Sequence, residues 1–492
     1  MKHLIVSILV LSIFGAASAQ NEPIEIAFVG DVLLARGVEK KINTYGPEYP
    51  FENVRHILSK ADLAFANLEG PLASKCEKLE KNYSFEGRPK NAGILKYAGI
   101  DIVSLANNHS LDCGNIGLFE TMDNLDSQNI RWVGAGRTKS ETESPVFLEI
   151  KNTRIAFLAI TKISPGSDES VAVAEFGRVE LPQTIATMRK KADVVIVSIH
   201  WGTEYASYPD VAQTDLAEQA TRAGADIVVG HHPHVLQGLS LGANAANDRK
   251  TLVAYSLGNF VFDSPTNRNR LLGESAILRV SVGKGGVREA DVIPVSIDGY
   301  RPSPAVGDER ERIFENLNKF SKRFETRIEN GILKEETKRS MITADLDSDG
   351  TPEIIDLDGS RENTIEIRHG KELKWQGVPT GWKPWKIDTA DVDGDGIKEV
   401  IVGVFKKTKF LPIPHNCLFV YGWKDGRAFP KWLGSRLSRP FTDFRFEDLD
   451  GKDGEELIAL ESDAAGNPST AVYVWDSFGF VLKERGVTSF GF

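Results

Sequence analysis

The sequence predicts a layered α/β domain with mixed sheets, followed by a β-rich repeat domain. Between residues 24 and 297, near-continuous apolar runs such as IEIAFVG and DVVIVSIHWG alternate with amphipathic stretches. That alternation is typical of buried strands covered by helices. After residue 340 an acidic segment recurs three times, and each copy leads into an apolar strand, which indicates a repeat array. A chain of 492 residues also exceeds what one hydrophobic core usually supports.

The N-terminus has the features of an export signal. Lys2 and His3 precede a mainly apolar run that ends at Phe14, and the small residues Ala17 and Ala19 follow. This order matches a basic segment, a short apolar core and a cleavage site, so residues 1–19 are predicted to be a signal peptide. An uncleaved anchor is the alternative. We expect a secreted or periplasmic protein of the cell envelope, with no transmembrane span after cleavage.

Net charge and cysteine content narrow the choice of partners and compartment. The formal net charge of −10 argues against nucleic acid as a partner, because binding a phosphate backbone requires a basic face. It is compatible with cation binding. The three cysteines, Cys76, Cys113 and Cys417, are too few for a disulfide scaffold. We hypothesise a single Cys76–Cys113 bridge in an oxidising compartment, with Cys417 buried.

Changes of pattern along the chain mark its domain boundaries. Residues 20–300 form the predicted α/β domain, in which residues 141–160 and 276–297 are predicted hairpins that make the sheets mixed. Residues 301–339 begin with two prolines and continue as a charged helical pattern, so they are interpreted as a helical linker. Residues 340–492 hold the repeats.

Side chains that can bind metals follow five of the predicted strands. Ligands of α/β sheets bind beyond the carboxyl ends of the strands, so these side chains should converge on one crevice. Oxygen donors mixed with imidazoles suit manganese, iron or zinc better than calcium. The strand-end residues are Asp31, Glu69, Asn107, Asn108, His109, His200, His231, His232 and His234. Any one of them alone would more often be structural, but together they predict a centre for one or two divalent transition-metal ions.

The order of these motifs resembles a known family. GD, NLE, ANNH, HWG-x-E, GHHPH and SLGNF follow one another between residues 24 and 263. This order is similar to the CapA-type proteins of poly-γ-glutamate capsule synthesis, which belong to the calcineurin-like metallophosphatase superfamily. The resemblance implies a metallophosphatase-like fold for the first domain. Transferred residue by residue, it implies as metal ligands Asp31, Glu69, Asn108, His200, His231 and His234.

The same resemblance implies two catalytic residues. His109 would act as general acid, a role that imidazole fills near neutral pH. Arg36 would hold a phosphate or carboxylate in a bidentate fork, with a surface salt bridge as the alternative. The sequence departs from the superfamily at Leu33, where most members place a histidine ligand, and at Glu69, where they place an aspartate. These departures leave a vestigial one-metal site as an alternative.

The acidic segments of the repeat domain predict calcium sites. Alternate carboxylates on a tight loop point to one side and form the oxygen cage that calcium prefers. A single copy would be explained by a solvated Asp-Gly turn, but three copies in register favour calcium. The predicted ligands are Asp345, Asp347, Asp349, Glu353, Asp391, Asp393, Asp395, Glu399, Asp448, Asp450, Asp453 and Glu456. The loops resemble FG-GAP or integrin-α-type repeats, which implies a propeller-like domain, although three repeats are too few for a closed propeller.

These observations lead to three functional hypotheses. The first is an exported CapA-type protein with a metal-dependent phosphoesterase role in the synthesis, export or release of an anionic polymer such as poly-γ-glutamate. Its expected partners are that polymer or a phosphoester substrate, and cell-envelope proteins. The second is a non-catalytic metal-binding scaffold for polymer or cell-surface attachment. The third is a secreted phosphatase of broad specificity.

Overall fold

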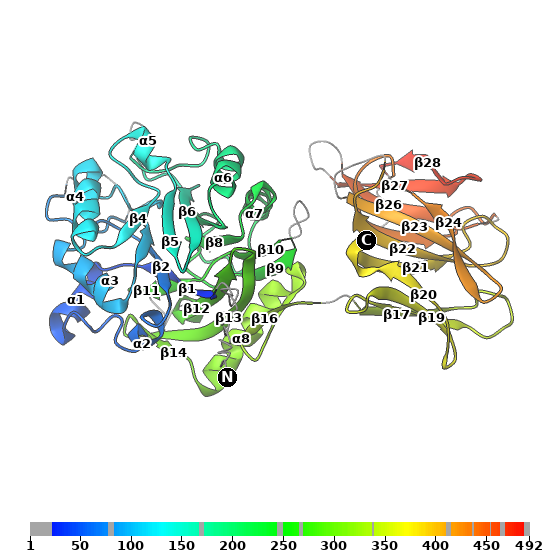
Figure 1. Ribbon diagram of the computed structural model, residues 1–492, viewed down its shortest axis with the longest axis horizontal. Helices are drawn as coiled ribbons and strands as arrows, with labels where there is room; N and C mark the ends of the chain where they lie inside the picture. Colours follow the sequence, from blue (N-terminus) through cyan, green and yellow to red (C-terminus); the bar gives the residue numbers. More distant parts are fainter. Residues whose placement is uncertain are drawn as a thin grey trace, which may run out of the picture. The chain divides into compact units, whose positions relative to one another are not determined.

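The computed structural model describes most of the chain as two compact units, divided between Glu335 and Glu336 (Figure 1). The described residues are 22–76, 83–166, 172–243, 249–264, 269–336, 339–409, 415–434, 437–452, 454–462 and 468–486. The predicted signal peptide lies outside them. Within these ranges no helix combines the length and apolar character needed to cross a bilayer.

The first sheet of the N-terminal unit is mixed. Its strands follow the order β15-β16-β13-β12-β1-β2-β3-β4, with β11 beside β1 and β14 beside β13. Strands β1 to β4 are parallel, whereas β12 and β13 form an antiparallel hairpin. The bounds are β1 Ile24–Val32, β2 Leu63–Leu68, β3 Ile102–Ser104, β4 Arg131–Val133, β11 Asn259–Val261, β12 Glu274–Gly283, β13 Gly286–Asp298, β14 Arg301–Pro304, β15 Thr326–Glu329 and β16 Ile332–Glu335.

The second sheet of this unit has the order β5-β6-β7-β8-β10-β9. Its four central strands are parallel, and β5 and β9 pair antiparallel at the two edges. The bounds are β5 Val146–Ile150, β6 Thr153–Thr161, β7 Val194–His200, β8 Ile227–His231, β9 Leu239–Ala243 and β10 Lys250–Ala254. The predicted hairpins at 141–160 and 276–297 are confirmed as β5–β6 and β12–β13, and the sheets are mixed as predicted.

The two sheets pack face to face, and helices cover their outer faces. Along β1, Ile26 and Phe28 enter the core between the sheets, whereas Ala27 and Val29 face the helices, as the two-residue period of a strand requires. Helices α1, α3 and α4 pack on the first sheet, and α6 and α7 pack on the second. The bounds are α1 Arg36–Tyr45, α2 Arg55–Leu58, α3 Ala92–Ala98, α4 Gly114–Ser127, α5 Lys139–Thr142, α6 Leu181–Arg189, α7 Val211–Ala223 and α8 Gly307–Ser321.

The segment 301–339 differs from the predicted helical linker. It contains the expected helix, α8, but β14 pairs with β13, and β16 joins β13 through the pair Asp291–Ile332. Helix α8 buries Ile313 and Leu317 against the core between the two sheets. The described part of the segment up to Glu335 therefore belongs to the first unit, because its strands complete that unit's sheet.

A disulfide joins Cys76 to Cys113, which confirms the hypothesised pairing. Cys113 precedes α4 directly, so the bridge ties the start of this helix to the segment that follows β2. Cys417 is a free, buried thiol on a strand of the second unit, also as predicted.

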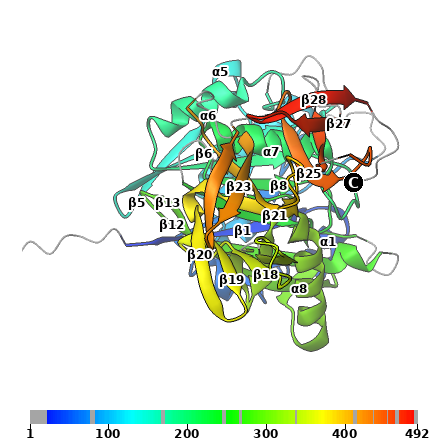
Figure 2. The same ribbon diagram turned by 90° about the vertical axis from the view of Figure 1, so that its right-hand side faces the viewer.

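The second unit consists of three four-stranded antiparallel sheets, in which each strand pairs with the next in sequence (Figures 1 and 2). Neighbouring sheets share hydrophobic clusters: Ile355 and Val402 belong to one, and Ile401 and Leu457 to the next. The bounds are β17 Arg339–Ala344, β18 Glu353–Asp358, β19 Asn363–His369, β20 Glu372–Pro379, β21 Pro384–Ala390, β22 Glu399–Lys406, β23 His415–Lys424, β24 Arg427–Leu433, β25 Phe441–Glu447, β26 Glu456–Ser462, β27 Pro468–Trp475 and β28 Phe480–Arg485. This unit is β-rich as predicted, and its closure into a propeller stays a prediction.

Candidate metal centre

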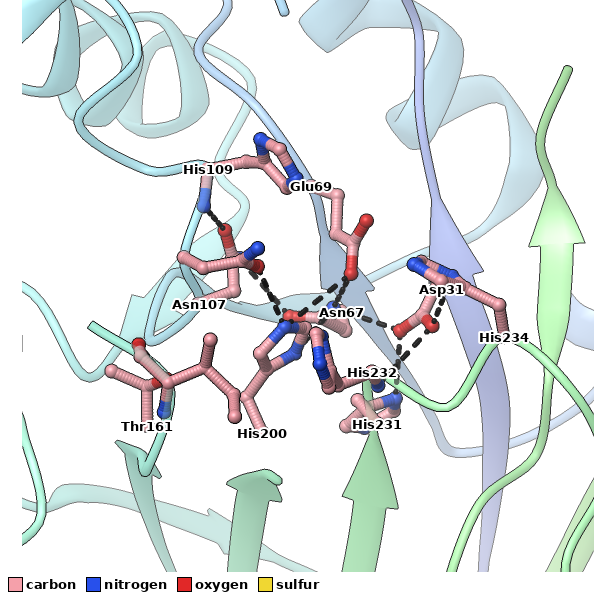
Figure 3. Close-up of polar contacts among 12 residues, drawn as sticks. Asp31, Asn67, Glu69, Asn107, His109, Thr161, His200, His231, His232 and His234 are labelled. Carbon is pink, nitrogen blue, oxygen red and sulfur yellow. Dashed lines mark hydrogen bonds and ion pairs between the residues drawn. The ribbon is translucent and has the colours of Figure 1, made fainter. Parts of the chain in front are cut away.

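The carboxyl ends of strands from both sheets of the first unit meet at one point (Figure 3). In the first sheet, Asp31 on β1 is in register with Asn67 on β2. In the second sheet, His200 on β7 is in register with His231 on β8. Parallel pairing thus brings residues that are far apart in sequence to the same edge, the usual position of a ligand site in such sheets. The side chains at this edge are almost fully buried.

Glu69 belongs to two groups of metal-competent side chains. In the first group, ligand atoms of Asp31, Glu69 and His234 all lie within 4.8 Å of one another. In the second, Glu69 Oε1 lies 3.6 Å from His200 Nε2, and Asn108 Oδ1 lies 2.8 Å from the same nitrogen. Glu69 Oε2 is buried without a hydrogen-bond partner. Buried polar atoms are nearly always paired, so an unpaired carboxylate oxygen at this position indicates a missing partner. A cation is a partner of the right charge.

Asn67 holds the carboxylates in place, and the sequence analysis did not predict it. Its Nδ2 donates to Asp31 Oδ1 at 2.9 Å and approaches Glu69 Oε1 at 3.4 Å, while its Oδ1 accepts from Asn107 at 3.2 Å. The strand period contained the signal, since residues 67 and 69 of FANLE lie on the same side of an extended chain.

The GHHPH motif contributes three imidazoles with different surroundings. His234 Nδ1 lies 3.3 Å from Asp31 Oδ2 and 3.0 Å from Asn259 Oδ1, so Asn259 helps to orient this ring. His231 Nδ1 lies 3.4 Å from Asp31 Oδ1, without hydrogen-bond geometry at either ring nitrogen. His232, which was not among the predicted ligands, has its ring centroid 4.8 Å from that of His200.

A further group joins His232 and His234 to Glu204, whose ligand atoms lie within 4.8 Å of one another. Glu204 is exposed, in contrast to the other members of the centre. It was also not among the predicted ligands, although the HWG-x-E motif places it four residues after His200.

His109 is held by a buried carboxylate. Its Nδ1 lies 2.8 Å from Asp112 Oδ2, and Asp112 also accepts from the backbone N–H of Phe85 at 2.7 Å. The Phe85 ring stacks on the imidazole with a centroid distance of 3.9 Å. Asp112 is therefore a positioning residue that fixes the ring and leaves Nε2 free of that contact.

Arg36 lies beside the centre and pairs with a carboxylate. Its Nε is 3.2 Å from Asp263 Oδ2, and its guanidinium carbon is 5.2 Å from the Phe85 ring centroid. The guanidinium is partly exposed, with 42% of its side chain accessible. The structure thus places Arg36 next to the ring that contacts His109.

Burial and mutual charge move the pKa values of this cluster in opposite directions. Burial raises the pKa of Glu69 well above its usual range, and the negative charge of Asp31 adds to this. For Asp31 the contacts with His231 and His234 outweigh the effect of burial and hold its pKa well below the usual range. The carboxylates of Glu69 and Asp31 likewise outweigh burial at His234 and raise its pKa to about 9. When no metal is bound, a proton on His234 thus offsets the negative charge of the buried carboxylates.

The donor set fits a divalent transition metal. It combines two carboxylates, an amide oxygen and several imidazoles in a buried setting, with ring nitrogens and a carboxylate oxygen left without partners. Leu33 supplies no ligand, because it packs with Ala35, Phe85 and Phe262. The position two residues after Asp31 therefore adds no imidazole to the group around Asp31.

The acidic loops of the second unit gather some of their predicted calcium ligands. Ligand atoms within 4.8 Å of one another come from three residues in each loop. These are Asp345, Asp347 and Glu353; Asp391, Asp393 and Glu399; and Asp448, Asp450 and Glu456. Asp349 and Asp395 are not members and accept instead from the backbone N–H of Thr351 and Ile397. Asp453 lies outside the described residues.

In two of these loops a lysine side chain contacts the carboxylates. Lys431 Nζ lies 2.5 Å from Asp393 Oδ2 and 2.7 Å from Glu399 Oε1. In the third loop, Lys483 contacts Asp450 and Glu456 in the same way, at 3.1 and 2.9 Å. In the first loop the contact to Glu353 comes from His369 Nδ1 at 2.8 Å. The first loop therefore fits calcium better than the other two, where an ammonium group bridges the carboxylates.

The fold and the site define a layered α/β protein with a buried cluster of carboxylates and imidazoles at its strand ends. The profile of the bacterial capsule synthesis protein family PGA_cap matches residues 25–264. The chain is 30% identical to the capsule biosynthesis protein CapA of Bacillus anthracis over 318 residues, which cover 61% of this chain and 74% of that protein. The chain therefore belongs to this CapA family of capsule synthesis proteins.

Two further relatives are similar to this chain. The PGA biosynthesis protein CapA of Bacillus subtilis (strain 168) is 31% identical over 324 residues, or 64% of this chain and 82% of the relative. A probable polyglutamine synthesis accessory protein of Mycobacterium tuberculosis is 24% identical over 291 residues, or 54% of this chain and 74% of the relative.

We expect Asn67→Asp to destabilise the metal-free protein. The substitution keeps the shape but replaces the donor between Asp31 and Glu69 with a third carboxyl group. The free energy of unfolding should fall by about 2–4 kcal/mol, the cost of leaving buried charges without compensation. Urea unfolding in the presence of a chelator measures the change. Asn43→Asp, at an exposed position on α1, is the matched control, and equal stability of the two variants would contradict the assigned role.

Lys431→Met should destabilise the second unit when calcium is chelated. The loss of the ammonium leaves Asp393 and Glu399 facing each other, at a cost of about 1–3 kcal/mol. Added calcium should restore more stability in this variant than in the wild type. Thermal unfolding with and without calcium tests both effects, with Lys424→Met at an exposed strand end as control. The bridging role is wrong if the two variants melt alike in chelator.

Proposed function

We propose that this chain is an exported, metal-dependent phosphoesterase-like protein that acts in the synthesis, export or release of an anionic capsule polymer such as poly-γ-glutamate. Membership of the CapA family supports the polymer class. The chemistry is supported mainly by one observation, the shared position of Glu69 between the Asp31–His234 pair and the Asn108–His200 pair. A carboxylate between two ligand groups is the arrangement that a two-metal site requires.

Divalent ions bound to these groups would activate water and neutralise the charge that develops on a phosphoryl group. The protein's own residues would then handle binding and proton transfer. Asp112 holds the Nδ1 side of His109, so Nε2 is the atom that would deliver a proton to the leaving oxygen. Asn67 and Asn107 fix the carboxylates through a continuous chain of amide hydrogen bonds.

A non-catalytic scaffold is the second candidate, and Leu33 is the observation that favours it. With an apolar side chain in place of an expected imidazole, the group around Asp31 offers three protein ligands, and one ion could be lost. Such a protein would hold polymer or an envelope protein through a single ion at Glu69, Asn108 and His200.

Elemental analysis and hydrolysis assays on the purified protein distinguish these functions. The phosphoesterase proposal predicts two transition-metal equivalents and turnover of a generic phosphodiester or phosphomonoester with manganese. Glu69→Ala should remove metal from both groups, whereas His109→Asn should keep the metal and lose at least about 100-fold in turnover, the usual contribution of a general acid. His56→Ala, at an exposed site, is the control.

One metal equivalent without turnover in the wild type would support the scaffold. Turnover that is unchanged in His109→Asn would contradict the assigned general acid. Efficient hydrolysis of many unrelated phosphoesters, with no affinity for the polymer, would favour a phosphatase of broad specificity.

Metal affinity should rise with pH up to about pH 9. His234 has its pKa raised to about 9 in the metal-free state, so below that pH it carries a proton that a metal must displace. Asp31 is already ionised and contributes no pH dependence in this range. Calorimetric titration with manganese in buffers of different ionisation enthalpy measures the protons released. An affinity that stays constant from neutral pH to pH 9 would contradict this linkage.

A further inference from the structure

We propose that a basic cavity along α1, next to the metal centre, binds successive carboxylates of the capsule polymer. The cavity has a volume of about 710 Å³ and lies between α1, the segment after β11 and the turn between β13 and β14. Its helical wall contains two adjacent rows of residues, one at positions 36, 40 and 44 and the other at 37, 41 and 45. Residues four apart lie on the same face of a helix, so the cavity follows α1 along its whole length.

The charge of this wall is positive. Arg36, Lys40 and Lys41 line the cavity, against a single carboxylate from Asp263. No ion pair joins Lys40 or Lys41 to any residue that the structure describes; Lys41 Nζ instead lies 5.4 Å from the ring centroid of Tyr45. The chain as a whole has a net charge of −10, so the two adjacent lysines without an ion pair to the described residues are a specific feature and not a general property of the surface.

The cavity and the metal centre share a wall. Phe85 contacts Arg36 on the cavity side and stacks on His109 on the centre's side. The neighbouring wall is formed by residues 262 and 263: Asp263 lines the cavity, and the Phe262 ring lies 4.9 Å from the His234 ring. Lining residues of the α1 cavity are therefore next to the aromatic rings that contact His109 and His234.

The spacing of the cations matches a γ-linked polyglutamate. Arg36 and Lys40 are separated by four residues of α-helix, a rise of about 6 Å. Each γ-linked glutamate adds five backbone bonds, which span roughly 6 Å when extended. Successive carboxylates of a fully extended chain point to opposite sides, so the chain must turn about its single bonds for neighbouring units to meet Arg36 and Lys40. This assignment rests on the proposed polymer class, and the cavity would act as a subsite that holds the polymer beside the centre.

Titration of the full-length protein with a short γ-linked polyglutamate tests the subsite. Lys40→Ala/Lys41→Ala should raise the Kd roughly tenfold, because it removes two of the three cations that line the cavity. Lys190→Ala/Lys191→Ala removes an exposed adjacent pair of lysines at the end of α6 and should leave the Kd unchanged. Added salt should reduce the difference between the two double variants.

Equal Kd values for the two double variants, or no binding by the wild type, would overturn the subsite. This result is distinguishable from failure of the proposed function, which is measured by metal content and phosphoester turnover. If the wild type shows no turnover but Lys40→Ala/Lys41→Ala still weakens polymer binding, the subsite is supported and only the enzymatic role is contradicted.

Discussion

The structure of the first unit depends on two buried carboxylates, Asp31 and Glu69, that lie at neighbouring strand ends. An ionised carboxylate in a low-dielectric interior is costly unless positive charge or donors compensate it. Around this pair the chain supplies an amide donor from Asn67 and imidazoles from the facing sheet. The pKa of His234 is raised while that of Glu69 is also raised, so protons take up the compensation where no cation is bound. A metal that replaces these protons would stabilise the fold by the same interaction.

The two-sheet architecture explains how these groups meet. One sheet alone could place carboxylates and amides after β1, β2 and β3 at its edge, but all the imidazoles except His109 come from the ends of β7 and β8 of the other sheet and the segment that follows β8. Stacked contacts such as Phe65 on Phe157, with centroids 5.8 Å apart, hold the two sheets together behind the centre. Because the ligands are divided between the sheets, the geometry of the site depends on the packing of this core, and binding at the site in turn links the sheets.

The sequence predicted the layered fold, and it predicted which polar side chains gather at the strand ends, because both follow local rules. Apolar runs identified the strands, and the polar residue after each run identified the edge, which gave Asp31, Glu69, Asn108, His200 and His234. It missed Asn67: the strand period places this residue on the same side as Glu69, but nothing local indicates its hydrogen bond to Asp31, 36 residues away. The segment 301–339 was misjudged because β14 to β16 are short and rich in polar residues. Their pairing with β13 is set by tertiary contacts that no local pattern reveals.

The second unit faces the same electrostatic problem and solves it differently. Each acidic loop gathers three carboxylates, and their mutual repulsion must be offset for the hairpin to close. In the second loop a lysine from the last strand of the sheet reaches the carboxylates, and Asp393 and Glu399 outweigh burial to raise its pKa, which keeps it charged. A tethered ammonium is present whatever the external calcium concentration, whereas the first loop has only a histidine at Glu353. The loops share the sequence motif, but in the second and third loops the lysine that contacts the carboxylates lies on the last strand of the sheet, outside the motif. The motif alone therefore does not define a calcium site.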